Sequence, residues 1–153
     1  MAEQLDDLQS DGLDVIVDAG RLDAHGLPRP LLERARTIAV VTRSNLPALA
    51  ALRLALPELV SASELASASP ALVVAGGGRP YSASEIAKQL EIALLADLPW
   101  DPPTAEVFSS GALPPRRLTS RPLWKALQAL ALELGGQRTM FGRQANARGQ
   151  GAS

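Results

Sequence analysis

The chain has no cysteine among its 153 residues and only one histidine, His25. These counts exclude disulfides, thiolate metal sites, a cysteine nucleophile and metal sites built from several histidines. Aromatic residues make up only 3% of the chain, so a hydrophobic core has to be built from Leu, Val, Ile and Ala. His25 is not accompanied by a G-x-S-x-G motif, which argues against a hydrolase of the Ser-His-Asp type.

Long apolar runs and targeting signals are also missing. No stretch approaches the roughly 20 apolar residues that cross a bilayer, so we expect no membrane span. The first twelve residues, MAEQLDDLQSDG, are acidic and lack the basic and apolar segments of a secretory signal. A net charge of -1 and a hydrophobic content of 46% are typical of a soluble domain, and we expect the protein to be cytoplasmic.

Short apolar runs alternate with helical patterns along the chain. Such runs are typical of strands buried on both faces of a parallel sheet. We predict strands at Leu13–Ala19, Thr37–Thr42, Ala71–Gly76 and Ile92–Leu98, and helices at Pro30–Arg36, Leu46–Leu56, Ser82–Leu90, Pro102–Ser110 and Ser120–Leu134. The alternation predicts an α/β fold of three layers, with a mostly parallel sheet of about four strands flanked by helices.

Local signals mark several boundaries. Ser44 or Asn45 can cap the helix that begins at Leu46, and Ser82 with Glu85 has the spacing of a capping box. Residues 61–70, SASELASASP, form either a loop or a frayed helix. We predict a flexible acidic segment at 1–12, one α/β domain at 13–134 and a disordered tail at 135–153, because the tail has too little apolar surface to offset the entropy of ordering it.

Candidate ligand-binding residues fall where the predicted strands end. In an open parallel sheet, ligands bind beyond the carboxyl ends of the strands. Asp18 ends the first run, and its carboxylate could hold Mg²⁺ through water or orient an attacking water; the alternative is that it caps a turn. The run Gly76–Arg79 lies where phosphate-binding loops occur, and Arg79 could meet an anion; the alternative is a tight turn that needs positive φ.

The last third of the chain is basic although the whole chain is weakly acidic. It could be a solvated face, or a weak surface for nucleic acid or an acidic partner. The basic residues are Arg116, Arg117, Arg121 and Lys125, followed by Arg138, Arg143 and Arg148 in the predicted tail.

The order of these motifs resembles the second half of the ParA/MinD-type ATPases, the deviant P-loop proteins of the SIMIBI class that position chromosomes, septa, pili and other cargo. LDVIVDAG resembles their second acidic motif, Walker B, and TIAVVTRSNLPALAALRLAL resembles the strand and helix that follow. The segment from Ala71 to Gly111 is similar to the late strand, the Ser-x-x-Glu-Ile helix, the Leu-Pro-x-Asp loop and a short helix. SRPLWKALQALALEL resembles the terminal helix, so the resemblance covers residues 13–134.

The resemblance implies a partial P-loop NTPase-like fold that handles ATP and Mg²⁺. It makes Asp18 the catalytic Walker B residue, which would hold Mg²⁺ through water. The residues that it places at the base end of the nucleotide are Gly76, Gly77, Gly78, Arg79, Pro99 and Asp101.

Three features of the family have no counterpart in this sequence. The Lys-Gly-Gly-x-Gly-Lys phosphate loop, Walker A, is not found before Leu13, and the asparagine that commonly ends the late strand is replaced around Ala75 and Gly76. The membrane-targeting helix that ends some members is not matched in the tail. Without backbone amides and a lysine around the phosphates, we expect no tight ATP or Mg²⁺ binding and no ATPase activity by this chain alone.

We therefore expect a truncated or degenerate ParA/MinD-like protein that acts in chromosome or plasmid partitioning, or in positioning a septum, pilus or secretion apparatus. A shortened gene product and a miscalled start are alternatives. An internal strand missing from the sheet leaves two apolar edges, so we expect either a contracted sheet or a homodimer or protein partner that supplies a strand.

Two other functions are open. One is a non-enzymatic interaction module that binds a protein partner, or weakly binds nucleoid DNA, through the basic last third. The other is a small-molecule binder or enzyme in which Arg79 takes the anion of its ligand.

Overall fold

A computed structural model describes residues 15–21, 35–66 and 68–149. In this part of the chain a parallel sheet of three strands contains β1 (Ile38–Arg43), β2 (Pro70–Ala75) and β3 (Ala93–Leu98), in the order β1-β2-β3. The three later strands predicted from the sequence, and their parallel arrangement, are confirmed. Continuous apolar runs form such strands because helices can cover both of their faces.

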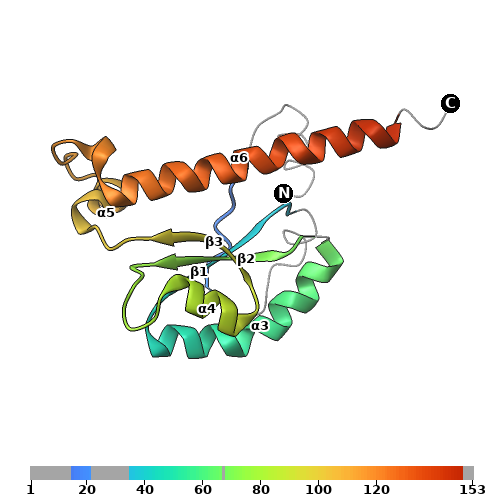
Figure 1. Cartoon of the computed structure of the whole chain (residues 1–153), viewed down its shortest axis with the longest axis horizontal. Helices are drawn as coiled ribbons and strands as arrows, with labels where there is room; N and C mark the ends of the chain where they lie inside the picture. Colours follow the sequence, from blue (N-terminus) through green and yellow to red (C-terminus); the bar gives the residue numbers. More distant parts are fainter. Residues whose placement is uncertain (1–14, 22–34, 67, 150–153) are drawn as a thin grey trace.

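The helices are α3 (Leu46–Ala66), α4 (Ala83–Leu90), α5 (Pro102–Ser109) and α6 (Pro122–Gly149), with a 3₁₀ turn at Leu118–Ser120 before α6. Figure 1 shows three layers: α3 and α4 cover one face of the sheet, and α6 runs along the other. The predicted α/β class with helices on both faces is therefore confirmed. Among the described helices, none combines the length and the hydrophobicity that a membrane crossing requires.

The main core lies between the sheet and the pair of helices α3 and α4. Side chains of β1 alternate between buried and exposed, because successive residues of a strand point to opposite faces. Ile38 and Val40 point into the core, whereas Val41 is 66% exposed on the opposite face. The other large core side chains are Leu52, Leu59, Leu72, Val74, Ile86 and Ile92.

The strand predicted at Leu13–Ala19 is not formed in its described part, so the described sheet has three strands instead of about four. Residues 15–21 have no regular secondary structure, and Ile16 is 91% exposed. A local hydrogen bond competes with extended pairing here: the Gly20 backbone amide donates to Asp18 Oδ1 at 2.9 Å. Such a bond is typical of an Asx-turn, and Gly20 has a positive φ of 78°.

α3 is longer than predicted. Of the two candidate caps, Asn45 is the one used, since the Ala48 amide donates to Asn45 Oδ1 at 3.0 Å. The helix continues through Pro57 to Ala66, so most of the segment 61–70 is helical. Ser63 is buried there, and its hydroxyl donates to the Val60 carbonyl at 2.7 Å, which satisfies a polar group inside the packed layer.

The start of α4 is the predicted capping box. The Glu85 amide donates to Ser82 Oγ at 3.3 Å, and the Ser82 amide donates to the Glu85 carboxylate at 2.8 Å. The Ser82 hydroxyl also donates to the Glu85 carboxylate at 2.7 Å; this bond, followed by the one from the Ser82 amide, holds the pKa of Glu85 below its usual value, because both favour the charged carboxylate. α5 ends one residue before its predicted end, and Gly111 follows with a φ of 69°.

α6 extends well beyond Leu134. Its backbone is helical to Gly149, whereas the composition of residues 135–149 predicts disorder. No proline removes a backbone donor after Pro122, so helical hydrogen bonding continues through the glycine pair at the cost of about 1 kcal/mol per glycine. The domain boundaries stay a prediction, and the segments 1–12 and 150–153 lie outside the described residues. So does most of the helix predicted at Pro30–Arg36; Ala35 and Arg36 are not helical.

Candidate functional site

Loops that are distant in the sequence meet at the carboxyl ends of the three strands. Ser44, just after β1, is buried and donates its hydroxyl to the carbonyl of Arg79 at 2.7 Å. The Gly76 amide, just after β2, donates to the carbonyl of Leu98 at the end of β3, also at 2.7 Å. The structure therefore brings the Gly76–Arg79 turn and the loop after β3 together, as their positions at strand ends predict.

Backbone conformation and close neighbours favour glycine at positions 76 to 78 of this turn. Gly76 has a φ of 72° and Gly78 a φ of 100°, both in the region that other residues rarely adopt. A Cβ at Gly77 would lie 2.1 Å from Asp97 Oδ1, and one at Gly76 would lie 3.2 Å from the Trp100 ring. Neither neighbour has a local signal in the sequence, because the approach of Asp97 to Gly77 depends on the pairing of β2 with β3.

Arg79 is exposed on this turn, and it has no ion pair among the residues that the structure describes. Trp100 is 76% exposed in the neighbouring loop, and Pro99 is half-buried beside it. The carboxyl-end rim of the sheet thus carries the exposed side chain of Arg79 in the loop after β2 and the exposed indole of Trp100 in the loop after β3. These groups suit an anionic ligand with a planar part, since cations and ring faces recognise such groups.

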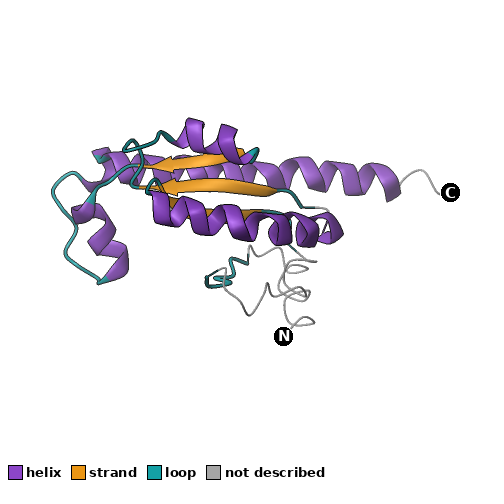
Figure 2. Ribbon diagram, turned by 90° about the horizontal axis from the view of Figure 1, so that it is seen from below, coloured by secondary structure: helices purple, strands orange, loops and turns teal. Residues whose placement is uncertain are grey.

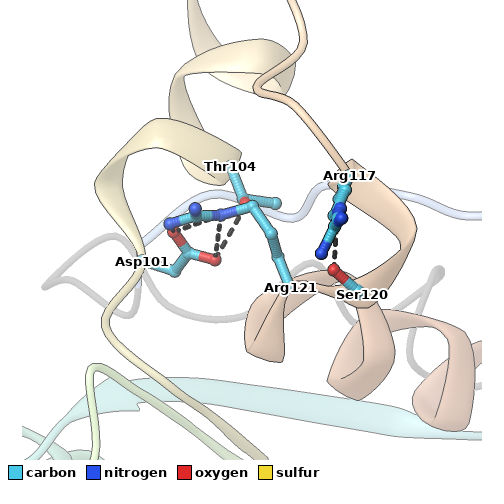
Figure 3. Close-up of polar contacts among 5 residues, drawn as sticks. All are labelled: Asp101, Thr104, Arg117, Ser120 and Arg121. Carbon is cyan, nitrogen blue, oxygen red and sulfur yellow. Dashed lines mark hydrogen bonds and ion pairs between the residues drawn. The ribbon is translucent and has the colours of Figure 1, made fainter.

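Asp101 has a structural role in addition to the one that the resemblance implies for it. Its side chain is buried, and both carboxylate oxygens are hydrogen-bonded to Arg121, which lies twenty positions later in the chain (Figure 3). The Arg121 Nε atom lies 3.0 Å from each oxygen, and Nη2 forms a further ion pair with Oδ1. Thr104 is fully buried and donates its hydroxyl to Asp101 Oδ2 at 2.8 Å.

This arrangement of Asp101, Thr104 and Arg121 stabilises the charged carboxylate. The hydrogen bonds from the Arg121 guanidinium are the largest cause, and they lower the pKa of Asp101 from 3.8 to about 2. The same interaction raises the pKa of Arg121. Since its oxygens are already occupied, the carboxylate ties the start of α5 to the start of α6, and any contact with a nucleotide base stays a prediction.

Asp18 is not positioned at the end of a strand. Its described hydrogen bond is the turn contact with Gly20, in a segment that lies outside the sheet (Figure 2). The residues that the structure describes contain no group of three acidic, histidine or cysteine side chains that could hold a metal ion. The hydrogen bond with Gly20 therefore supports the alternative that Asp18 caps a turn, while its metal-binding and catalytic roles stay predictions. His25 lies outside the described residues.

The basic last third is divided between two environments. Arg116, Arg117 and Lys125 are exposed, whereas the guanidinium of Arg121 is taken up by Asp101. Ser120 also bonds within this region, since its hydroxyl donates to the Arg117 carbonyl at 2.9 Å. α5 and α6 are further joined by stacking of Phe108 on Trp124, with ring centroids 6.1 Å apart. The exposed basic surface is thus smaller than the charge count predicts.

A parallel α/β sheet with helices on both faces, and with loops gathered at the carboxyl ends of its strands, defines an open α/β fold of the kind that binds ligands at that edge. The fold is similar to that of the MinD cell division protein of Aquifex aeolicus, with a TM-score of 0.70 over 88% of this chain and 15% sequence identity. The match covers 59% of the MinD chain, so this chain spans less than two thirds of that protein. No family model and no curated protein match the sequence.

The likeness to MinD confirms the predicted P-loop NTPase-like fold. At 15% identity it establishes the fold alone, and a fold carries many functions. The function must therefore be argued from the site.

Proposed function

We propose that this protein is a ParA/MinD-like positioning protein that acts through partner binding in chromosome or plasmid partitioning, or in placing a septum, pilus or secretion apparatus. The observation that carries the proposal is the joined set of loops at the carboxyl ends of β1, β2 and β3. These loops follow one another in the order of the ParA/MinD-type motifs, on a fold similar to that of MinD.

We further propose that the chain does not hydrolyse ATP by itself. The printed sequence contains no Lys-Gly-Gly-x-Gly-Lys loop, and the main electrostatic contribution to phosphoryl transfer comes from such a loop and its metal. In this proposal Gly76–Gly78 and Arg79 keep a weak anion-binding rim. Asp18 would handle Mg²⁺-bound water only in an assembly in which another chain supplies the phosphate loop.

A calorimetric titration with ATP and Mg²⁺ tests the ligand part of this proposal. We expect weak binding that is reduced further in Arg79→Ala and is unchanged in Arg116→Ala, which replaces another exposed arginine outside the rim. Phosphate release should stay at the level of a protein-free control. Steady ATP turnover by the purified chain, abolished by Asp18→Asn, would contradict the proposal.

The positioning role is tested in cells by imaging a fluorescent fusion of the full chain. We expect the fusion to gather at the nucleoid, the poles or midcell, and its gene deletion to disturb chromosome, septum or pilus placement. A uniform distribution together with normal placement of all these structures would count against the proposed function.

A further inference from the structure

The outer edge of β1 is open in the described part of the structure. β1 is the first strand in the sheet order, and its described strand partner is β2 alone. The face of β1 that points away from α3 and α4 carries Ala39, Val41 and Arg43, all exposed. An edge strand with unpaired backbone groups and an exposed apolar face can receive another strand.

The same structure contains an exposed apolar segment without a strand partner. Residues 15–18, Val-Ile-Val-Asp, lie outside the sheet in Figure 2, and their exposed apolar side chains include Ile16 at 91% and Val17 at 46%. These β-branched residues favour the extended conformation. One chain therefore exposes both an open strand edge and an apolar segment suited to pair with it.

We propose that two copies of this chain exchange these segments, so that residues 15–18 of one copy add to the outer edge of β1 in the other. The pairing is parallel, with Ile16 beside Val41 and Asp18 beside Arg43. Since each copy offers one segment and one edge, the exchange closes with twofold symmetry, as domain-swapped dimers do.

Side-chain alternation sets this register. A strand shifted by one residue turns every side chain to the opposite face, so Ile16 can join Val41 on the open face only if Val15 and Val17 join Val40 and Thr42 on the core face. The parallel direction also places opposite charges side by side, because Asp18 then meets the exposed Arg43. An antiparallel strand with Ile16 beside Val41 would instead place Asp18 beside Ala39.

The occupant is a second copy because the single chain does not use its own segment. Within one chain, residues 15–21 form no strand, the Gly20 amide donates to Asp18 Oδ1, and Ile16 stays exposed. Exchange between two copies buries residues 15–18 of each copy against the outer edge of β1 in the other. Cross-strand apolar and charged neighbours of this kind are the contacts that stabilise a sheet.

Single-cysteine variants test the exchange directly, because the chain has no cysteine of its own. Purified Ile16→Cys and Val41→Cys are mixed and oxidised mildly; neighbouring strands bring their Cα atoms within the distance that a disulfide spans. We expect a covalent dimer joining one variant to the other, in several-fold excess over a mixture of Ile16→Cys with Leu54→Cys. Leu54 is 85% exposed on α3 and is a matched reactive control.

Charge reversal tests the register. Asp18→Arg and Arg43→Asp should each weaken dimerisation, which light scattering measures, and the double variant should restore it. If Asp18→Arg acted only by removing the turn contact with Gly20, the second substitution would not restore dimerisation. A chain that stays monomeric at every concentration would overturn the proposal. So would a double-cysteine variant, Ile16→Cys with Val41→Cys, whose disulfide forms only within one chain.

Discussion

At the scale of single residues, the contact between Asp101 and Arg121 is expected to make stability depend on pH. The pKa of Asp101 is lowered in the folded state from 3.8 to about 2. A group with a lowered folded pKa contributes stability that is fully present above its unfolded pKa and is lost as the pH falls through its folded pKa. The contribution is therefore complete at neutral pH and fades between about pH 4 and pH 2.

Arg121→Gln should lower the thermal midpoint at neutral pH, because it removes the cationic partner of a buried carboxylate. The difference from the unmodified protein should narrow as the pH is stepped below 4, since protonation of Asp101 removes the same interaction. Thermal unfolding followed by circular dichroism measures both effects. Arg117→Gln is the control, because Ser120 bonds only to its backbone carbonyl; an equal loss in that variant would refute the explanation.

A second residue-scale prediction concerns Gly77. A methyl group in Gly77→Ala would overlap the end of the Asp97 side chain, which is exposed and can turn aside, so we expect a loss below the roughly 1–3 kcal/mol that overpacking of a core costs. Urea unfolding measures the loss. Adding Asp97→Ala should recover most of it, since the obstructing carboxylate is then gone; additive losses in the double variant would show that the contact does not cause the effect.

At the scale of elements, α3 is the helix in which sequence and packing disagree. Pro57 lies inside it, where proline cannot donate a backbone hydrogen bond, and Figure 1 shows α3 bending in its second half. The helix continues because Leu52 and Leu59, on either side of the proline, are both buried against the sheet. Tertiary packing thus outweighs the local preference for stopping.

Pro57→Ala should stabilise the protein, because an interior proline is about 3 kcal/mol less favourable in a helix than alanine. We expect a gain smaller than this value, since the bent helix already fits the sheet. Urea unfolding of Pro57→Ala measures the gain, and Ala51→Gly, at an exposed position of the same helix, should show the opposite sign. A destabilised Pro57→Ala variant would mean that the bend is needed to seat Leu59.

At the scale of the whole molecule, segment exchange predicts that stability depends on protein concentration. Association that occurs only in the folded state raises the midpoint of unfolding as the concentration rises. The unmodified chain should show this rise in calorimetric scans over a wide concentration range, and Arg43→Asp should show a much smaller one. A midpoint that is independent of concentration in both proteins would be inconsistent with a dimer joined by folded strands.

The sequence by itself determined the three later strands, the α/β class and the start of α4. These features depend on signals contained within a few residues, such as the apolar run at β2 and the capping box of Ser82 and Glu85. It also placed the Gly76–Arg79 turn and the loop after β3 at the same edge, because parallel strands all end on one side. The likeness to MinD agrees with this arrangement.

The tertiary structure decided which side chains meet at and near the carboxyl ends of the strands. Asp101 and Arg121 are twenty positions apart, and the Gly77–Asp97 contact crosses two strands, so neither pair has a local signature. Only the structure showed that Val15–Asp18 lies outside the sheet while β1 keeps an open edge. The physical reason is that a strand is completed by hydrogen bonds to a partner, and an apolar run of residues does not specify which partner it receives.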